Sequence, residues 1–169
     1  MNDLLAILDQ AYDRRSWHGT NLRGSIRGLS MEQAAWRPGR SRHNIWEIVV
    51  HAAYWKYAAR RRLTGEARGS FPVKGSNWFE RPGRAPRVQM KADTTAVWRA
   101  DIALLDEMHR ALLDAVAHLS PVSLHRRIAR SKDTNFSLIT GVAAHDLYHA
   151  GQIQLLKRLE ASNFRPSAD

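Results

Sequence analysis

The sequence predicts an all-α protein, a four-helix bundle formed by a single domain over residues 1–169. Four segments repeat apolar residues at helical spacing, and no segment shows the alternation expected of a convincing strand. In two of these segments the apolar positions step by four and three residues in turn, which is the stripe that packs helices side by side. Four such helices can share one core as a four-helix bundle.

The first two helices are separated by a stretch that contains several glycines and serines. The first helix is expected over residues 3–17 and the second over residues 44–64. Asn44 can cap the second helix, and the carboxylate of Glu47, three residues further on, can reach back to free amides of the first turn. Gly65 suits the left-handed conformation in which many helices end.

A long loop over residues 66–92 is expected between the second and third helices, because prolines and glycines break the periodicity there. A connection of this length inside a compact domain is usually functional or lies across the fold. Two aromatic residues of this loop, Trp78 and Phe79, are expected to line the mouth of a pocket.

The third helix is expected over residues 95–119 and the fourth over residues 137–161, with a loop over residues 122–135 between them. The stripe of the third helix contains one histidine: Trp98, Ile102, Leu105, His109, Leu112, Val116 and Leu119. The stripe of the fourth helix contains two: Leu138, Val142, His145, His149, Gln152, Leu156 and Leu159. Polar side chains thus interrupt both apolar stripes.

Composition excludes several classes of function. The chain contains no cysteine, which excludes disulfides, cysteine-ligated zinc, iron–sulfur clusters and a cysteine nucleophile. It contains no Gly-x-Ser-x-Gly motif, no phosphate-binding loop and no dinucleotide fingerprint. Because the N-terminus does not resemble a signal peptide and no apolar run is long enough to span a bilayer, a cytoplasmic protein without a membrane partner is expected.

The charge raises the question of an anionic partner. The net charge is +10, from 26 Lys and Arg against 16 Asp and Glu, and an excess of this size can attract nucleic acid. The basic residues are scattered, however, and form no long run of like charge. A solvated basic surface is therefore favoured, and a nucleic-acid-binding bundle is the weaker alternative.

Two histidines of the fourth helix have the spacing of metal ligands. His145 and His149 lie four residues apart, so their imidazoles point to the same side of a helix, about one turn from each other. Two nitrogens at this spacing can hold one metal ion. Gln152 follows one turn later, so three polar groups in succession on a buried stripe need partners. A cation provides a partner for both histidines at once.

His51, near the middle of the second helix, is the best candidate for a third ligand. Facing helices of a bundle build metal sites in this way. Considered alone, His51 is better explained as a core histidine that bonds to a neighbour such as Glu47. The presence of His145 and His149 on the fourth helix reverses that preference. Three neutral imidazoles leave an open coordination position, which is typical of catalytic metal sites. Such a metal lowers the pKa of bound water or binds a substrate thiolate.

Four further residues are candidates for supporting roles. Glu47, Asp146 and Gln152 could orient an imidazole N–H or a bound water. For Asp146 a solvated position beside His145 fits equally well. His109 could be a fourth ligand, an acid–base group or a packed neutral ring, of which packing or an indirect contact with the site is favoured.

Four segments carry a resemblance to a known family: HNIWEIVVHAAYWKYAARRRLTG, FPVKGSNWF, WRADIALLDEMHRALL and AAHDLYHAGQIQLLKRL. They resemble the DinB-like superfamily of bacterial four-helix-bundle proteins, over about residues 4–159. The most specific part is the H-x3-H-x2-Q pattern together with the isolated histidine of the second helix. The resemblance implies a divalent metal ion, nickel or zinc, held by His51, His145 and His149, and it implies a homodimer.

The resemblance also implies an activity. Members of the superfamily include metal-dependent hydrolases and transferases or isomerases that use low-molecular-weight thiols. A metal-dependent hydrolase or a thiol-dependent transferase that acts on a small molecule is therefore expected. The alternative is a metal-binding interaction or stress-response protein without turnover.

Overall fold

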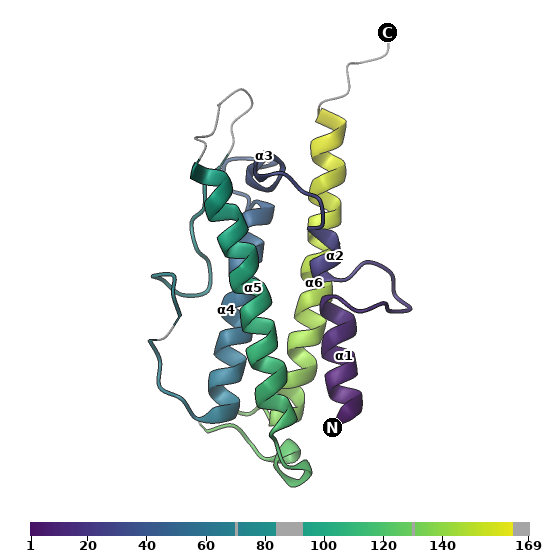
Figure 1. Cartoon of the computed structure of the whole chain (residues 1–169), viewed down its shortest axis with the longest axis vertical. Coiled ribbons are helices and arrows are strands. Elements are labelled where there is room, and N and C mark those ends of the chain that lie inside the picture. The colour runs from purple at the N-terminus through teal and green to yellow at the C-terminus, as the bar shows by residue number, and fades with distance from the viewer. Residues whose placement is uncertain (70, 84–92, 130, 164–169) are drawn as a thin grey trace.

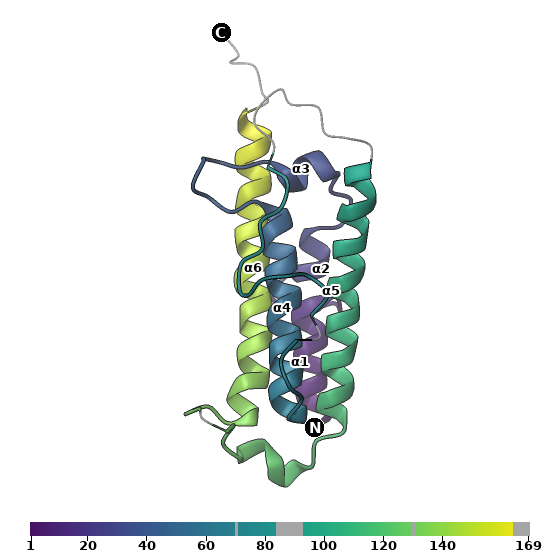
Figure 2. The ribbon, with the colours of Figure 1, turned by 90° about the vertical axis from the view of Figure 1, so that its left-hand side faces the viewer.

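The computed structural model describes residues 1–69, 71–83, 93–129 and 131–163. Four long helices run along the longest axis of the molecule (Figures 1 and 2): α1 (Asn2–Tyr12), α4 (Ile45–Thr64), α5 (Asp93–Ala117) and α6 (Asn135–Asn163). Apart from isolated bridges, the described residues form no strand. The predicted all-α bundle is confirmed. No helix in the described ranges is long and apolar enough to cross a membrane.

The helix α4 begins and ends where the sequence predicts. The side chain of Asn44 accepts a hydrogen bond from the amide of Glu47, and the Glu47 carboxylate accepts one from the amide of Asn44. Gly65 closes the helix in the left-handed conformation, with φ of +77°. These caps fix the register of the helix that carries His51.

The helix α1 is shorter than predicted and ends at Tyr12. The chain turns after it because the side-chain amide of Asn21 donates a hydrogen bond of 2.8 Å to the carbonyl of Arg14. Trp17, which the prediction placed at the end of the helix, is fully exposed. The segment therefore loses its apolar face after Tyr12, and with it the packing that would extend the helix.

Three short helical segments lie where the sequence predicts only connections. They are α2 (Leu22–Ser25), α3 (Met31–Ala35) and the 3₁₀-helix η1 (Pro121–His125). Each is too short for its apolar residues to show a helical period, which is why the sequence pattern does not reveal them. The ends of α5 and α6 lie within two residues of the predicted positions.

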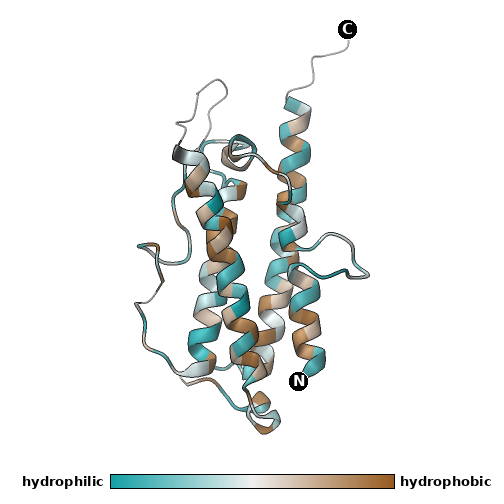
Figure 3. Cartoon of the chain, viewed as in Figure 1, coloured by the Kyte–Doolittle hydropathy of each residue, from teal (hydrophilic) through white to brown (hydrophobic). Residues whose placement is uncertain are grey.

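The core consists of two clusters of buried apolar side chains, one toward each end of the bundle. Trp46 and Trp98 meet edge to face in one cluster, and Leu8 and Leu112 pack in the other. Figure 3 shows hydrophobic and hydrophilic residues interleaved along every helix, as amphipathic helices require. Inside the bundle, four buried polar side chains in contact with one another, one from each long helix, form a polar layer: Tyr12, Lys56, His109 and Asp146.

The described part of the predicted long loop, residues 66–69 and 71–83, forms neither helix nor strand, and residues 84–92 lie outside the described residues. Phe79 is buried and packs with Tyr54 and Phe71, at ring-centroid distances of 5.4 and 5.3 Å. Its expected place at a pocket mouth is therefore wrong, because this ring anchors the loop to the core. Trp78 lines a cavity beside α6, as expected.

Candidate metal centre

Three histidines from α4 and α6 converge at one point beside the polar layer. The Nε2 atom of His145 lies 3.1 Å from Nε2 of His51 and 3.0 Å from Nε2 of His149. His51 and His149 are buried, and His145 is partly exposed. Within the described residues, no other group of three His, Asp or Glu side chains approaches closely enough to share an ion. The predicted ligand residues are thus brought together.

The remaining ring nitrogens of the two outer histidines are already bonded. Nδ1 of His51 lies 2.7 Å from the backbone carbonyl oxygen of Asn77, and a carbonyl only accepts, so this Nδ1 carries the proton. Nδ1 of His149 lies 2.7 Å from the side-chain oxygen Oε1 of Gln152 and is a donor in the same way. In both rings Nε2 is therefore left as an unprotonated nitrogen that faces His145.

All three rings are uncharged near neutral pH. Burial lowers the pKa of His145 to about 3, helped by repulsion from Lys56 and from the protonated forms of the other two histidines. Burial lowers the pKa of His149 to about 4, although its bond to Gln152 opposes the shift. Burial likewise lowers the pKa of His51. Neutral imidazole is the form that ligates a metal ion.

This donor set fits a divalent transition metal. Neutral imidazoles suit zinc and nickel, and nitrogens that bind one tetrahedral ion at about 2.0–2.1 Å lie about 3.3–3.4 Å apart. The measured separations of 3.0 and 3.1 Å are within a few tenths of that value. Without a cation, Nε2 of His145 can donate its proton to only one of its two neighbours, so the lone pair of the other neighbour is left without a donor.

Comparison with known protein families decides the assignment of the chain. A family model of the DinB superfamily matches residues 14–153, more than four-fifths of the sequence. The chain belongs to the DinB superfamily. No curated protein and no solved structure matches it. The matched range includes all three histidines, and the metal binding that is general in the DinB superfamily is compatible with the cluster.

In this DinB-superfamily bundle, the loop between α4 and α5 completes the site. Asn77 adopts a left-handed backbone conformation, with φ of +65°, which asparagine tolerates better than most residues. Its side-chain oxygen accepts a hydrogen bond of 3.0 Å from the indole N–H of Trp55. Trp78 stacks on His51 with ring centroids 3.9 Å apart, and His43 stacks on Trp78 at 3.7 Å. The loop thus holds the His51 ring by a hydrogen bond and by stacking.

The sequence did not reveal these contacts of Asn77 and Trp55. The group that Asn77 offers to His51 is a backbone carbonyl, which every residue possesses. The one available signal was the density of aromatic residues in the loop, and it predicted a pocket lining without identifying His51 as the partner.

Gln152 is the supporting candidate that the structure places in contact with the cluster. Its Oε1 faces Nδ1 of His149, and its side-chain N–H donates a bond of 3.0 Å to the hydroxyl of Tyr148. The amide thus bonds to two side chains and presents its oxygen to His149.

Glu47 and His109 lie away from the cluster. The Glu47 carboxylate accepts a hydrogen bond from the Arg37 guanidinium, and Nδ1 of His43 lies 2.9 Å from the same carboxylate. Burial raises the pKa of Glu47, but these bonds outweigh burial and lower it below its ordinary value. His109 stacks on Tyr12 at a centroid distance of 3.8 Å, and burial lowers its pKa to about 2.

Asp146 lies next to His145 in the chain but faces the core, where it pairs with Lys56. Both side chains are fully buried, and the Lys56 ammonium lies 4.8 Å from the centroid of the Tyr12 ring. Burial lowers the pKa of Lys56 and raises that of Asp146, and the attraction within the pair opposes both shifts. The solvated position considered for Asp146 is therefore wrong, because Lys56 offers it a partner inside the bundle.

Proposed function

We propose that this DinB-superfamily chain is a metal-dependent enzyme in which His51, His145 and His149 hold one divalent ion, nickel or zinc. The supporting observation is the convergence of three neutral imidazole nitrogens, two of which are kept unprotonated by bonds on the opposite side of their rings. Three protein ligands leave a coordination position for a small molecule. The reaction is hydrolysis or the transfer of a low-molecular-weight thiol.

Several protein groups around the site position the ligand histidines and cover them. When bound, an ion of this kind supplies Lewis-acid chemistry, by polarising a carbonyl or lowering the pKa of a water or thiol. The Asn77 carbonyl and Gln152 hold two rings in the tautomer that ligates. The indole of Trp78 covers one face of His51 and keeps water from it. His145, which is partly exposed, marks the side from which a substrate reaches the site.

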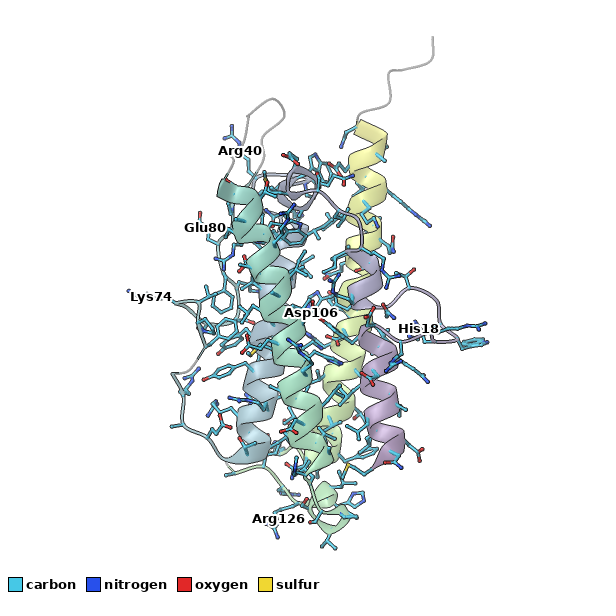
Figure 4. The ribbon with its side chains drawn as sticks, viewed as in Figure 1. His18, Arg40, Lys74, Glu80, Asp106 and Arg126 are labelled. Atoms are coloured by element: carbon cyan, nitrogen blue, oxygen red, sulfur yellow. The ribbon has the colours of Figure 1, made fainter. Side chains whose placement is uncertain are left out.

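Metal analysis of the purified protein tests the site. Wild type should bind one zinc or nickel ion per chain at neutral pH, and His149→Ala should lose most of it. His18→Ala and His125→Ala are matched controls, because both residues are exposed and lie outside the cluster (Figure 4 shows His18 on an outward loop). If the triple substitution of His51, His145 and His149 retained one metal ion per chain, the site would lie elsewhere.

A substrate screen tests turnover. Metal-loaded wild type and His149→Ala are compared on ester, amide and thiol-conjugate substrates. Turnover that requires His149 supports the enzyme. A wild type that binds one metal ion per chain but turns over none of these classes favours the metal-binding protein without turnover. The homodimer stays a prediction, which sedimentation analysis at micromolar concentration checks.

A further inference from the structure

A cavity of about 630 Å³ lies between α6 and the segment that leads into α4. Figure 2 shows that segment, between α3 and α4, passing beside α6. This volume is in the range of pockets that bind small molecules. Six of the lining residues carry the chemistry of its walls: Pro38, Arg42, Ile48, Leu155, Leu156 and Leu159.

One end of the cavity is formed by two residues that contact the ligand histidines, although none of the three histidines lines it. Trp78 and Gln152 also line the cavity. Trp78 stacks on His51, and Gln152 bonds to Nδ1 of His149. A molecule in the cavity therefore touches two residues that hold the histidine rings in place.

The wall formed by α6 is apolar although much of it faces solvent. Leu155 and Leu159 are 59% and 39% exposed, while Leu156 beside them is buried. With Tyr148 and Gln152, the two exposed leucines form a stripe with steps of four, three and four residues, outside the core stripe of the same helix. The helix thus offers a second apolar surface that contributes nothing to the folded core and can be covered by a hydrocarbon group.

The charged side chain that lines the cavity is basic. Arg42 is exposed and forms no ion pair with any residue in the described part of the chain, and none of the residues that line the cavity is acidic. The one lining histidine, His43, is already held by Glu47. The Arg42 guanidinium is therefore left to bind an anion from solution.

We propose that this cavity is a binding site, beside the metal centre, for an anion with a hydrocarbon body. The charged group lies at Arg42, the body lies along Leu155 and Leu159, and the end of the body reaches Trp78 and Gln152. From Gln152 to Leu159 the helix rises about 10 Å, which sets the length of the body. The binding of this anion does not depend on the proposed function.

Octanoate is a probe of the required length and charge, and octan-1-ol is the matched uncharged probe. Both are titrated by ligand-detected NMR into wild type, with and without zinc. Octanoate should bind more tightly than octan-1-ol. Arg42→Gln should raise the Kd of octanoate by about threefold to tenfold and leave that of octan-1-ol unchanged, because only a charged hydrogen bond is lost. Leu155→Gln should raise both Kd values by about fivefold, because an apolar contact is lost.

Two exposed residues outside the cavity provide matched controls. Arg40→Gln removes the same charge from the same segment (Figure 4), and Ile7→Gln replaces a half-exposed apolar residue on α1. Neither should change the Kd of either probe. The proposed pocket is contradicted if Arg42→Gln behaves like Arg40→Gln. It is also contradicted if Leu155→Gln changes the mass of the protein in solution without raising the Kd of octanoate, because the leucines would then serve self-association.

Metal content measured on the same samples separates this inference from the proposed function. Octanoate binding that follows Arg42 and Leu155 in a protein that binds no metal would leave the anion site standing and overturn the proposed metal centre. One metal ion per chain without octanoate binding would leave the metal centre standing and overturn the pocket.

Discussion

At the scale of single residues, the metal centre depends on bonds made by atoms that do not face it. His51 and His149 present unprotonated Nε2 atoms because their Nδ1 atoms donate to Asn77 and Gln152. The sequence predicted a supporting role for Gln152 because it follows His149 by less than one helical turn. The same reasoning assigned Asp146 only to the site or to solvent, because a pattern within one helix cannot show that Lys56 of another helix faces it.

The Gln152 amide is expected to strengthen metal binding. Gln152→Leu should raise the Kd for zinc by about 10- to 100-fold, because the partner that orients a ligating histidine is lost. Competition with a chromogenic chelator measures the change. Gln152→Glu keeps an acceptor oxygen at the same position and is the control, which should recover most of the affinity. Equal zinc affinity in Gln152→Leu and wild type would contradict this role.

His109 is expected to make stability depend on pH. Its pKa in the folded protein is about 2, whereas an unfolded histidine has a pKa of about 6.5. Between these two pH values the unfolded chain binds more protons than the folded one. The contribution of His109 to the free energy of unfolding is therefore fully present above pH 6.5 and falls as the pH drops below that value. From pH 7 to pH 5 the loss is about 2 kcal/mol.

Urea denaturation of metal-free protein at pH 7 and pH 5 measures this effect. His109→Phe keeps a ring to stack on Tyr12 and has no titrating group, so its stability should fall by about 2 kcal/mol less than that of wild type over this range. The same pH dependence in both proteins would mean that His109 is charged in the folded state.

At the scale of elements, α4 and α5 could be predicted from periodicity, and α4 also from its caps. The face of α6 could be predicted only approximately. The predicted stripe includes Gln152 and Leu159, whereas the buried positions next to them are Ile153 and Glu160. Neighbouring positions on a helix differ by about 100° in direction. Because α6 also carries exposed leucines, the apolar pattern does not define which face of the helix is buried. That offset is what leaves Leu155 and Leu159 available to the cavity.

The loop between α4 and α5 is expected to act on His51 through its backbone. Asn77→Val should raise the Kd for zinc about tenfold or more, because a β-branched residue is strained at positive φ and the carbonyl that holds His51 moves. Asn77→Gly tolerates this conformation and loses only the bond to Trp55. It should therefore bind zinc nearly as tightly as wild type. Chelator competition on the two variants measures the difference, and equal losses in both would contradict a backbone role.

At the scale of the whole molecule, a polar layer lies inside the bundle. Lys56 and Asp146 form an ion pair in that layer with both side chains fully buried. The sequence could not reveal this layer, because its members come from four helices and a pattern within one helix does not show which side chains of other helices face it. Only the assembled bundle shows that they share one level.

The buried pair is expected to behave as a unit. Lys56→Met alone should destabilise the protein by about 3–5 kcal/mol, because it leaves the Asp146 carboxylate buried without a partner. The double substitution Lys56→Met and Asp146→Leu removes both charges and should be less destabilising than either single substitution. Urea denaturation in the presence of a chelator measures all three variants. A double variant that is destabilised by the sum of the two single effects would contradict the coupling.

The central claim is that three histidines hold one divalent ion with a coordination position left open. X-ray absorption spectroscopy of the zinc-loaded protein tests it most directly, because the spectrum reports the number and type of ligands. The account predicts three imidazole nitrogens at about 2.0–2.1 Å together with at least one light ligand that added small thiols replace by sulfur. A site with no more than one imidazole, or one closed by four protein ligands that thiols do not displace, would contradict it.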